Sequence, residues 1–79
     1  MSGANLAAVN AEKAEWFRRE YGIDARVGRR VLFEGHQGTI VGYSSSHLQI
    51  LLDGEREPGI YHPIWHIAYI DDVTREATR

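Results

Sequence analysis

Residues 27–52, VGRRVLFEGHQGTIVGYSSSHLQILL, contain three short apolar runs separated by turn residues, at 27–33, 39–43 and 47–52. Each run has the length of a β-strand, and the breaks at 34–38 and 44–46 are short enough to join antiparallel neighbours. Gly42 inside the second run predicts a bend or a bulge, which the corner of a small barrel requires. The stretch therefore predicts the centre of a small antiparallel β-barrel.

An amphipathic helix is predicted before the strands, over residues 5–22, because apolar side chains recur there at spacings of three and four. Gly22 is placed to end it in the left-handed conformation. The helix carries a bulky aromatic end formed by Trp16, Phe17 and Tyr21. The favoured interpretation is that these rings cover one opening of the barrel; the alternative is that they bind a partner or a second copy.

Downstream, residues 60–62 predict a short fourth strand and residues 67–70 a closing fifth strand. Pro63 between them predicts a compact turn over 62–65, formed as one turn of 3₁₀ helix. Residues 72–79 are polar and are expected to fray. With 79 residues, the chain is expected to form one domain, the barrel occupying residues 26–71.

Several short motifs carry a family resemblance: Gly35-x-x-Gly38-Thr39-Ile40, the serine loop, Leu48-x-Ile50-x-Leu52-Asp53-Gly54 and His62-Pro63-x-Trp65. In this order they resemble the Src-homology-three-like small barrels, and within that group they are most similar to KOW-type domains. The resemblance covers residues 26–71 and implies a single five-stranded antiparallel barrel that binds protein, RNA or DNA. With the helix, which lies outside the resemblance, the expected fold is mainly β with an N-terminal α-helix. Free-standing barrels of this composition also resemble bacteriophage and prophage accessory proteins.

The charge balance bears on the choice between these partners. Nine basic residues against eleven acidic ones give a net charge of −2, which disfavours non-specific binding to duplex DNA. The local basic cluster is formed by Arg26, Arg29 and Arg30, with Asp24 and Glu34 close in sequence. A locally neutralised surface is the favoured interpretation; if the arginines meet the tyrosines on one face, they predict a site for single-stranded RNA or DNA.

Catalytic and metal-binding patterns are weak. His62 and His66 are four residues apart, but Pro63 follows the first of them and the chain has no cysteine, so no metal site and no cofactor are predicted. The serines at 44–46, with His47 and Asp53, supply the residue types of a catalytic triad without a nucleophile-elbow pattern. We therefore expect neither an enzyme nor a small-molecule substrate.

The aromatic residues Tyr43, Tyr61, Trp65 and Tyr69 give the better indication of function. Exposed aromatics beside polar loops form grooves for extended peptides or stack on bases. For Trp65 and Tyr69 the favoured interpretation is that they close the core. The candidate binding residues are Tyr43, Tyr61, Trp65, Arg29 and Arg30.

These observations favour a non-enzymatic module for protein–protein interaction, self-associating through its helix or an exposed strand edge. The alternative is an accessory protein of KOW type that binds RNA or single-stranded DNA. No apolar run approaches the roughly 20 residues that span a bilayer, and the N-terminus lacks the pattern of a signal peptide. No membrane partner is expected, and the expected location is the cytoplasm.

Overall fold

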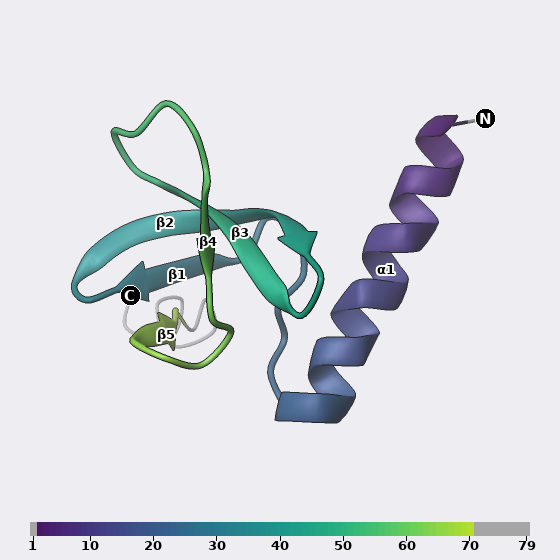
Figure 1. The fold of residues 1–79 in the computed structure, drawn as a ribbon, viewed down its shortest axis with the longest axis horizontal. Helices are drawn as coiled ribbons and strands as arrows, with labels where there is room; N and C mark the ends of the chain where they lie inside the picture. The colour runs from purple at the N-terminus through teal and green to yellow at the C-terminus, as the bar shows by residue number, and fades with distance from the viewer. Residues whose placement is uncertain (1, 71–79) are drawn as a thin grey trace, which may run out of the picture.

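The computed structural model describes residues 2–70, with side chains from residue 8 onward. One long helix, α1 (Ser2–Tyr21), is followed by five strands. The strands are β1 (Arg30–Phe33), β2 (His36–Ser44), β3 (His47–Leu52), β4 (Gly59–Tyr61) and β5 (Ile67–Tyr69). The predicted mainly β fold with an N-terminal helix is confirmed (Figure 1). The predicted polar tail at 72–79 lies outside the described residues.

The five strands form one antiparallel sheet in the order β4-β3-β2-β1-β5. β4 and β5 are its edges and are not hydrogen-bonded to each other, so the sheet is open and the predicted barrel is not confirmed. The sheet is nevertheless strongly curved. The rings of Tyr61 on β4 and Phe33 on β1 meet at 4.8 Å, although two strands lie between them in the sheet.

The connection between β1 and β2 is shorter than the predicted turn at 34–38. Glu34 and Gly35 have φ values of 50° and 87°, which two-residue hairpin turns of type I′ require. Because the turn is so tight, His36 and Gln37 already pair with β1 and belong to β2. Further along β2 the register shifts between Ile40 and Gly42, which confirms the predicted bulge.

Two other boundaries differ from the sequence-based expectation. β1 begins at Arg30 rather than at residue 27, because Gly28 adopts a φ of 97° in a turn and its amide donates to the carbonyl of Ile40 at 2.7 Å. Residues 62–65 form a bend and a turn rather than a 3₁₀ helix. The amides of Ile64 and Trp65 donate to the side-chain Nδ1 of His62, at 3.2 and 3.3 Å, instead of continuing a helical pattern.

The core lies between the concave face of the sheet and the C-terminal end of α1. Its fully buried apolar residues are Phe17, Ala25, Val31, Ile40, Leu48 and Ile50. Phe17 is the contribution of the helix, which confirms that the aromatic end of α1 packs against the sheet. The helix ends where predicted: Gly22 has a φ of 71° and its amide donates to the carbonyl of Arg18 at 2.8 Å.

Candidate functional site

Trp65 is the most exposed of the large apolar side chains that the structure describes, with 65% of its surface accessible. The interpretation that it closes the core is therefore wrong. Two neighbours occupy the interior instead: Pro63 is fully buried, and the Tyr69 hydroxyl donates to the Pro63 carbonyl at 2.7 Å. With Pro63 turned inward and its carbonyl held, the chain presents Trp65 to the outside. Tyr69 itself packs against the core, as expected.

The indole of Trp65 is held in place by His62. Their ring centroids lie 4.2 Å apart with an interplanar angle of 12°, a stacked arrangement. His62 is in turn met edge-on by His47 of β3 at 5.7 Å and by Tyr21 of α1 at 6.0 Å. We call these four residues the Trp65 surface. It joins the helix, the third strand and the β4–β5 connection, three segments that are far apart in the sequence.

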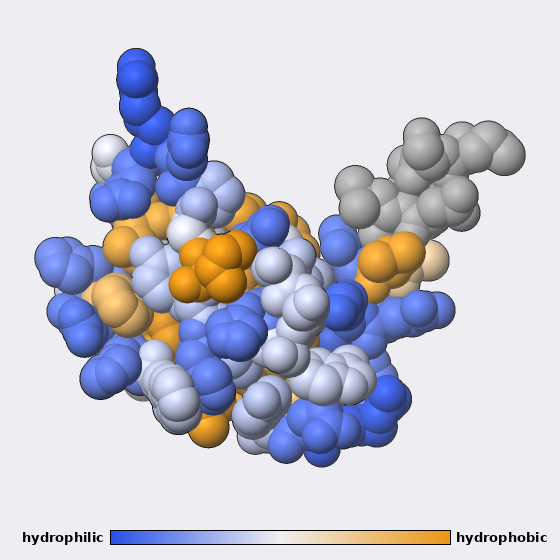
Figure 2. Space-filling view, in the orientation of Figure 1, coloured by the Kyte–Doolittle hydropathy of each residue, from blue (hydrophilic) through white to orange (hydrophobic). Residues whose placement is uncertain are grey.

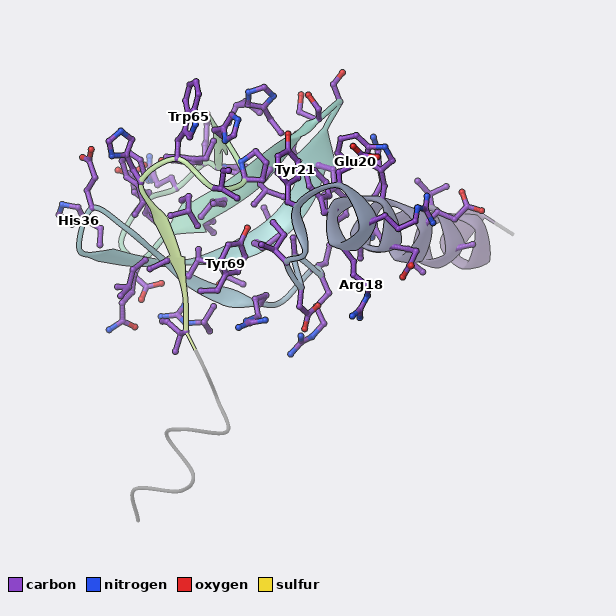
Figure 3. The ribbon with its side chains drawn as sticks, turned by 90° about the horizontal axis from the view of Figure 1, so that it is seen from below. Arg18, Glu20, Tyr21, His36, Trp65 and Tyr69 are labelled. Atoms are coloured by element: carbon purple, nitrogen blue, oxygen red, sulfur yellow. The ribbon has the colours of Figure 1, made fainter. Side chains whose placement is uncertain are left out.

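The side-chain directions support treating these residues as one surface. In Figure 3, Trp65 and Tyr21 point to the same side of the molecule, whereas Arg18 points to the opposite side. Ile64, next to Trp65 in the chain, is also exposed. Figure 2 shows exposed apolar residues as separate patches among polar ones on the face it presents. A flat aromatic ring in such a setting can bind an apolar or planar group of a partner.

The structure uses Tyr43 and Tyr61 mainly for packing. The Tyr43 hydroxyl donates to the carbonyl of Ala25 at 2.7 Å and its ring stacks on Phe17 at 5.5 Å. Partial burial raises the pKa of the Tyr43 hydroxyl above its usual value. Tyr61 turns its ring toward Phe33. Among the ring pairs of residues 8–70, neither tyrosine contacts Trp65, so these two candidates are not brought together with it.

The Arg29 side chain links two segments that are distant in the sequence. Its side chain is only 16% exposed. The guanidinium donates to the carbonyls of Asp24 at 3.1 Å and Ile70 at 2.9 Å, lies 3.3 Å from the Asp24 carboxylate and sits over the ring of Tyr69 at 5.5 Å. These contacts join the segment after α1 to the end of β5. They leave little of the guanidinium available to a ligand.

Arg30 is also fully engaged, on the outer side of the sheet. Its two terminal nitrogens donate to the two carboxylate oxygens of Asp53 at 3.0 and 2.7 Å, a bidentate pair. The same guanidinium donates to Thr39 Oγ1 at 2.7 Å and to Gln37 Oε1 at 2.9 Å. The hydrogen bond from Arg30 holds the pKa of the Asp53 carboxyl below its usual value. Arg29 and Arg30 are thus each paired with a carboxylate. This agrees with the interpretation of the arginine cluster as a locally neutralised surface.

A second feature, absent from the sequence reasoning, is a groove between α1 and the turn that joins β2 to β3. We call it the α1 groove; its volume is about 590 Å³. It is lined by Glu12, Lys13, Glu15, Trp16, Arg19, Ser45 and Ser46. Lys13 crosses one side of it, donating from Nζ to the carbonyl of Ser45 at 3.0 Å. In the sequence, Lys13 lies on the helix between the apolar residues Val9 and Trp16. This polar residue at an otherwise apolar position is the sequence feature that indicates a polar contact in the groove.

The histidines do not assemble into a metal site. No group of three or more potential metal-ligating His, Cys, Asp or Glu side chains occurs within the described residues. His66 lies 3.5 Å from the carboxylate of Glu34, whereas His62 faces His47 and Trp65, so the two members of the spaced pair have different neighbours. No helix in the described part of the chain has the length and apolar character needed to cross a membrane.

No protein-family model, curated protein or solved structure matches this chain.

Proposed function

We propose that this chain is a non-enzymatic protein-binding module and that the Trp65 surface contacts the partner. The observation that carries the proposal is the exposure of Trp65, 65%, combined with its stacking on His62 at 4.2 Å. Tryptophan in contact with solvent is a large apolar area left uncovered, and such residues contribute most of the binding free energy in many interfaces.

The way Trp65 is held also favours binding. Its ring is stacked on His62 and its amide donates to the Nδ1 of the same residue at 3.3 Å. Pro63 lies between these two residues in the connection and is buried. A side chain that is already ordered loses little conformational entropy when a partner covers it. The partner would therefore meet a preformed anchor.

Side chains rather than strand addition are the expected means of recognition. The two edges of the sheet, β4 (Gly59–Tyr61) and β5 (Ile67–Tyr69), are three residues long each. Edges this short offer few backbone groups for a partner strand. The exposed indole of Trp65, with the exposed Ile64 next to it in the chain, is the more accessible contact area.

Binding to RNA or single-stranded DNA is the second candidate, and the open face of Trp65 is the observation that favours it. Bases stack on such rings regardless of sequence. Against it stand the ion pairs of Arg29 and Arg30, which leave these guanidinium groups engaged by Asp24 and Asp53. Phosphate contacts need free basic groups. We therefore rank this function below protein binding.

One experiment tests the first candidate in cells. A photo-crosslinking amino acid is placed at position 65, with Val41 as the control position because it is also exposed but belongs to β2. We expect a discrete protein adduct from position 65 that is absent from position 41. Equal labelling from both positions would contradict a specific surface at Trp65.

The nucleic-acid candidate is tested with fluorescently labelled single-stranded RNA and DNA at low salt, where phosphate contacts are strongest. Binding that is lost in Trp65→Ala and kept in Val41→Ala would favour it over protein binding. Absence of binding at low salt removes it.

A further inference from the structure

The N-terminal half of α1 extends away from the sheet. The helix has 20 residues, about 30 Å of length, but its contacts with the core come from its C-terminal end. Among the described side chains, Lys13 is the most N-terminal one on α1 with a hydrogen bond to the strand region, where it donates to the β2–β3 turn. Figure 1 shows the N-terminal end of α1 standing clear of the strands. Helical segments of this length are marginal in isolation, so further contacts along α1 would stabilise the helix.

The helix face along the α1 groove has an ordered charge pattern. Glu12, Trp16 and Arg19 follow one another at spacings of four and three, which place them on one face. The acidic residue lies toward the N-terminus and the basic residue toward the C-terminus, with the indole between them. Within the described residues Glu12 has no ion pair, and Arg19 has an exposed contact of 3.9 Å with Glu15. Exposed contacts of that length contribute little to stability.

This pattern is complementary to itself when a second helix runs antiparallel. A two-fold axis between positions 15 and 16 brings Glu12 opposite the partner's Arg19 and Arg19 opposite the partner's Glu12. A parallel pair would place Glu12 against the partner's Glu12 and Arg19 against the partner's Arg19. Opposite charges attract and like charges repel, so the charge order favours the antiparallel arrangement. A two-fold contact also forms each pair twice.

We propose that the occupant of the α1 groove is the α1 helix of a second copy of this chain, bound antiparallel about this axis. The groove, about 590 Å³, falls in the size range of clefts that bury a drug-sized ligand, so the partner helix would fill it with only a few side chains. In this register residues 10–21 of the two helices overlap, and the partner's Val9 lies opposite Gly22 at the edge of the contact. Val9 is 51% exposed in the single chain. Self-association would thus cover the α1 groove and reach the exposed valine.

The proposal goes beyond a partner at the Trp65 surface and does not require one. It concerns a different set of side chains, those of the α1 groove. An interface centred on one helix pair belongs with the small, transient complexes that bury less than about 1,200 Å². We therefore expect a reversible equilibrium between monomer and dimer.

Sedimentation equilibrium of the whole chain, from micromolar to millimolar concentration, tests the proposal by charge reversal. Glu12→Arg places two arginines opposite each other, and Arg19→Glu places two glutamates opposite each other. Each variant is expected to raise the dimer dissociation constant by about tenfold or more, the scale of charge-pair effects at interfaces. The double variant Glu12→Arg with Arg19→Glu restores opposite charges. It is expected to recover the wild-type dissociation constant to within a few-fold.

Two control variants carry the same changes in net charge outside the groove. Glu57→Arg matches Glu12→Arg, and Arg56→Glu matches Arg19→Glu; both residues are exposed in the connection between β3 and β4. Neither control is expected to change the dissociation constant. Circular dichroism establishes that each variant remains folded.

A wild-type chain that stays monomeric at millimolar concentration would overturn the proposal, and so would a double variant as weak as either single one. Trp65→Ala separates this outcome from the proposed function. It is expected to leave the dimer unchanged while removing the partner contact at the Trp65 surface, so either surface can fail without the other.

Discussion

His62 contacts Trp65 in two ways: its ring stacks on the indole at 4.2 Å, and its Nδ1 accepts the Trp65 backbone amide at 3.3 Å. The second contact requires an unprotonated Nδ1, because a protonated nitrogen has no lone pair to offer. The geometry of the β4–β5 connection therefore depends on one imidazole acceptor. The rings that face this imidazole from other elements are those of His47 from β3 and Tyr21 from α1.

We predict that removing the Nδ1 acceptor of His62 loosens the connection that carries Trp65. Without this acceptor the Ile64 and Trp65 amides lose their hydrogen-bond partner, so the Trp65 amide and indole NMR signals should shift.

The matched variants for this test are His62→Phe, which keeps a flat ring but lacks the acceptor, and His36→Gln in β2. His36 is exposed at the start of its strand. The Trp65 signals should shift in His62→Phe and stay unchanged in His36→Gln. Unchanged Trp65 signals in His62→Phe would contradict the role of the Nδ1 acceptor.

Removal of the Phe17 side chain should be severely destabilising. Phe17 is fully buried and is the aromatic contact between α1 and the sheet core. Phe→Ala changes in cores cost about 3–5 kcal/mol, a large part of the stability of a small domain. Urea unfolding should show Phe17→Ala largely unfolded, and the exposed Val41→Ala within about 0.5 kcal/mol of the wild type. Near-wild-type stability of Phe17→Ala would mean that the helix does not pack as described.

Asp53→Asn should lower stability at neutral pH and have little effect in acid. The hydrogen bond from Arg30 lowers the pKa of Asp53 in the folded chain. A depressed carboxyl pKa adds stability above the unfolded value, about 3.9, and that stability is lost as the pH falls through the folded value. Thermal unfolding at pH 7 and near pH 2 measures this difference.

The effect of Asp53→Asn is expected to be small, since the pair is solvent-exposed. Glu57→Gln removes an exposed carboxylate and serves as its control. A difference between Asp53→Asn and the wild type that is as large in acid as at pH 7 would contradict a role of the ionised pair.

Tyr69→Phe should remove the tyrosine hydroxyl that ionises at an unusually high pH. Burial raises the pKa of the Tyr69 hydroxyl, which donates to the Pro63 carbonyl. A raised tyrosine pKa contributes stability that is present below the unfolded value, about 10, and is lost as the pH rises through the folded value. An alkaline absorbance titration of Tyr69→Phe should lack the latest tyrosine transition, and the variant should be about 1 kcal/mol less stable at pH 7. An unchanged titration would contradict the burial of this hydroxyl.

The features that sequence reasoning predicted correctly are local. The periodicity and Gly22 define the helix, and the glycine in the second apolar run marks a bulge that the pairing of β2 and β3 contains. The strand positions along the chain and the alternation of side chains follow from turn residues and from the two-residue period. Each of these patterns is set by residues that are close together in the sequence, so the sequence alone is enough to recognise it.

The features that were missed depend on contacts between distant residues. The exposure of Trp65 follows from an imidazole that accepts two amides and from Tyr69, which binds the buried Pro63. The engagement of Arg29 depends on the Ile70 carbonyl, 41 positions away. The α1 groove exists because the β2–β3 turn is placed beside the helix. No spacing rule within one segment contains this information.

The most direct test of the Trp65 surface is a calorimetric titration of the purified partner, once crosslinking has identified it, with the wild-type chain, Trp65→Ala and Val41→Ala. Since Trp65 is largely exposed, its replacement should leave the unfolding temperature close to that of the wild type. The account predicts at least about a tenfold loss of affinity for Trp65→Ala, the scale of an interface hot spot, and no significant change for Val41→Ala. Equal affinity of the wild type and Trp65→Ala for that partner would contradict it.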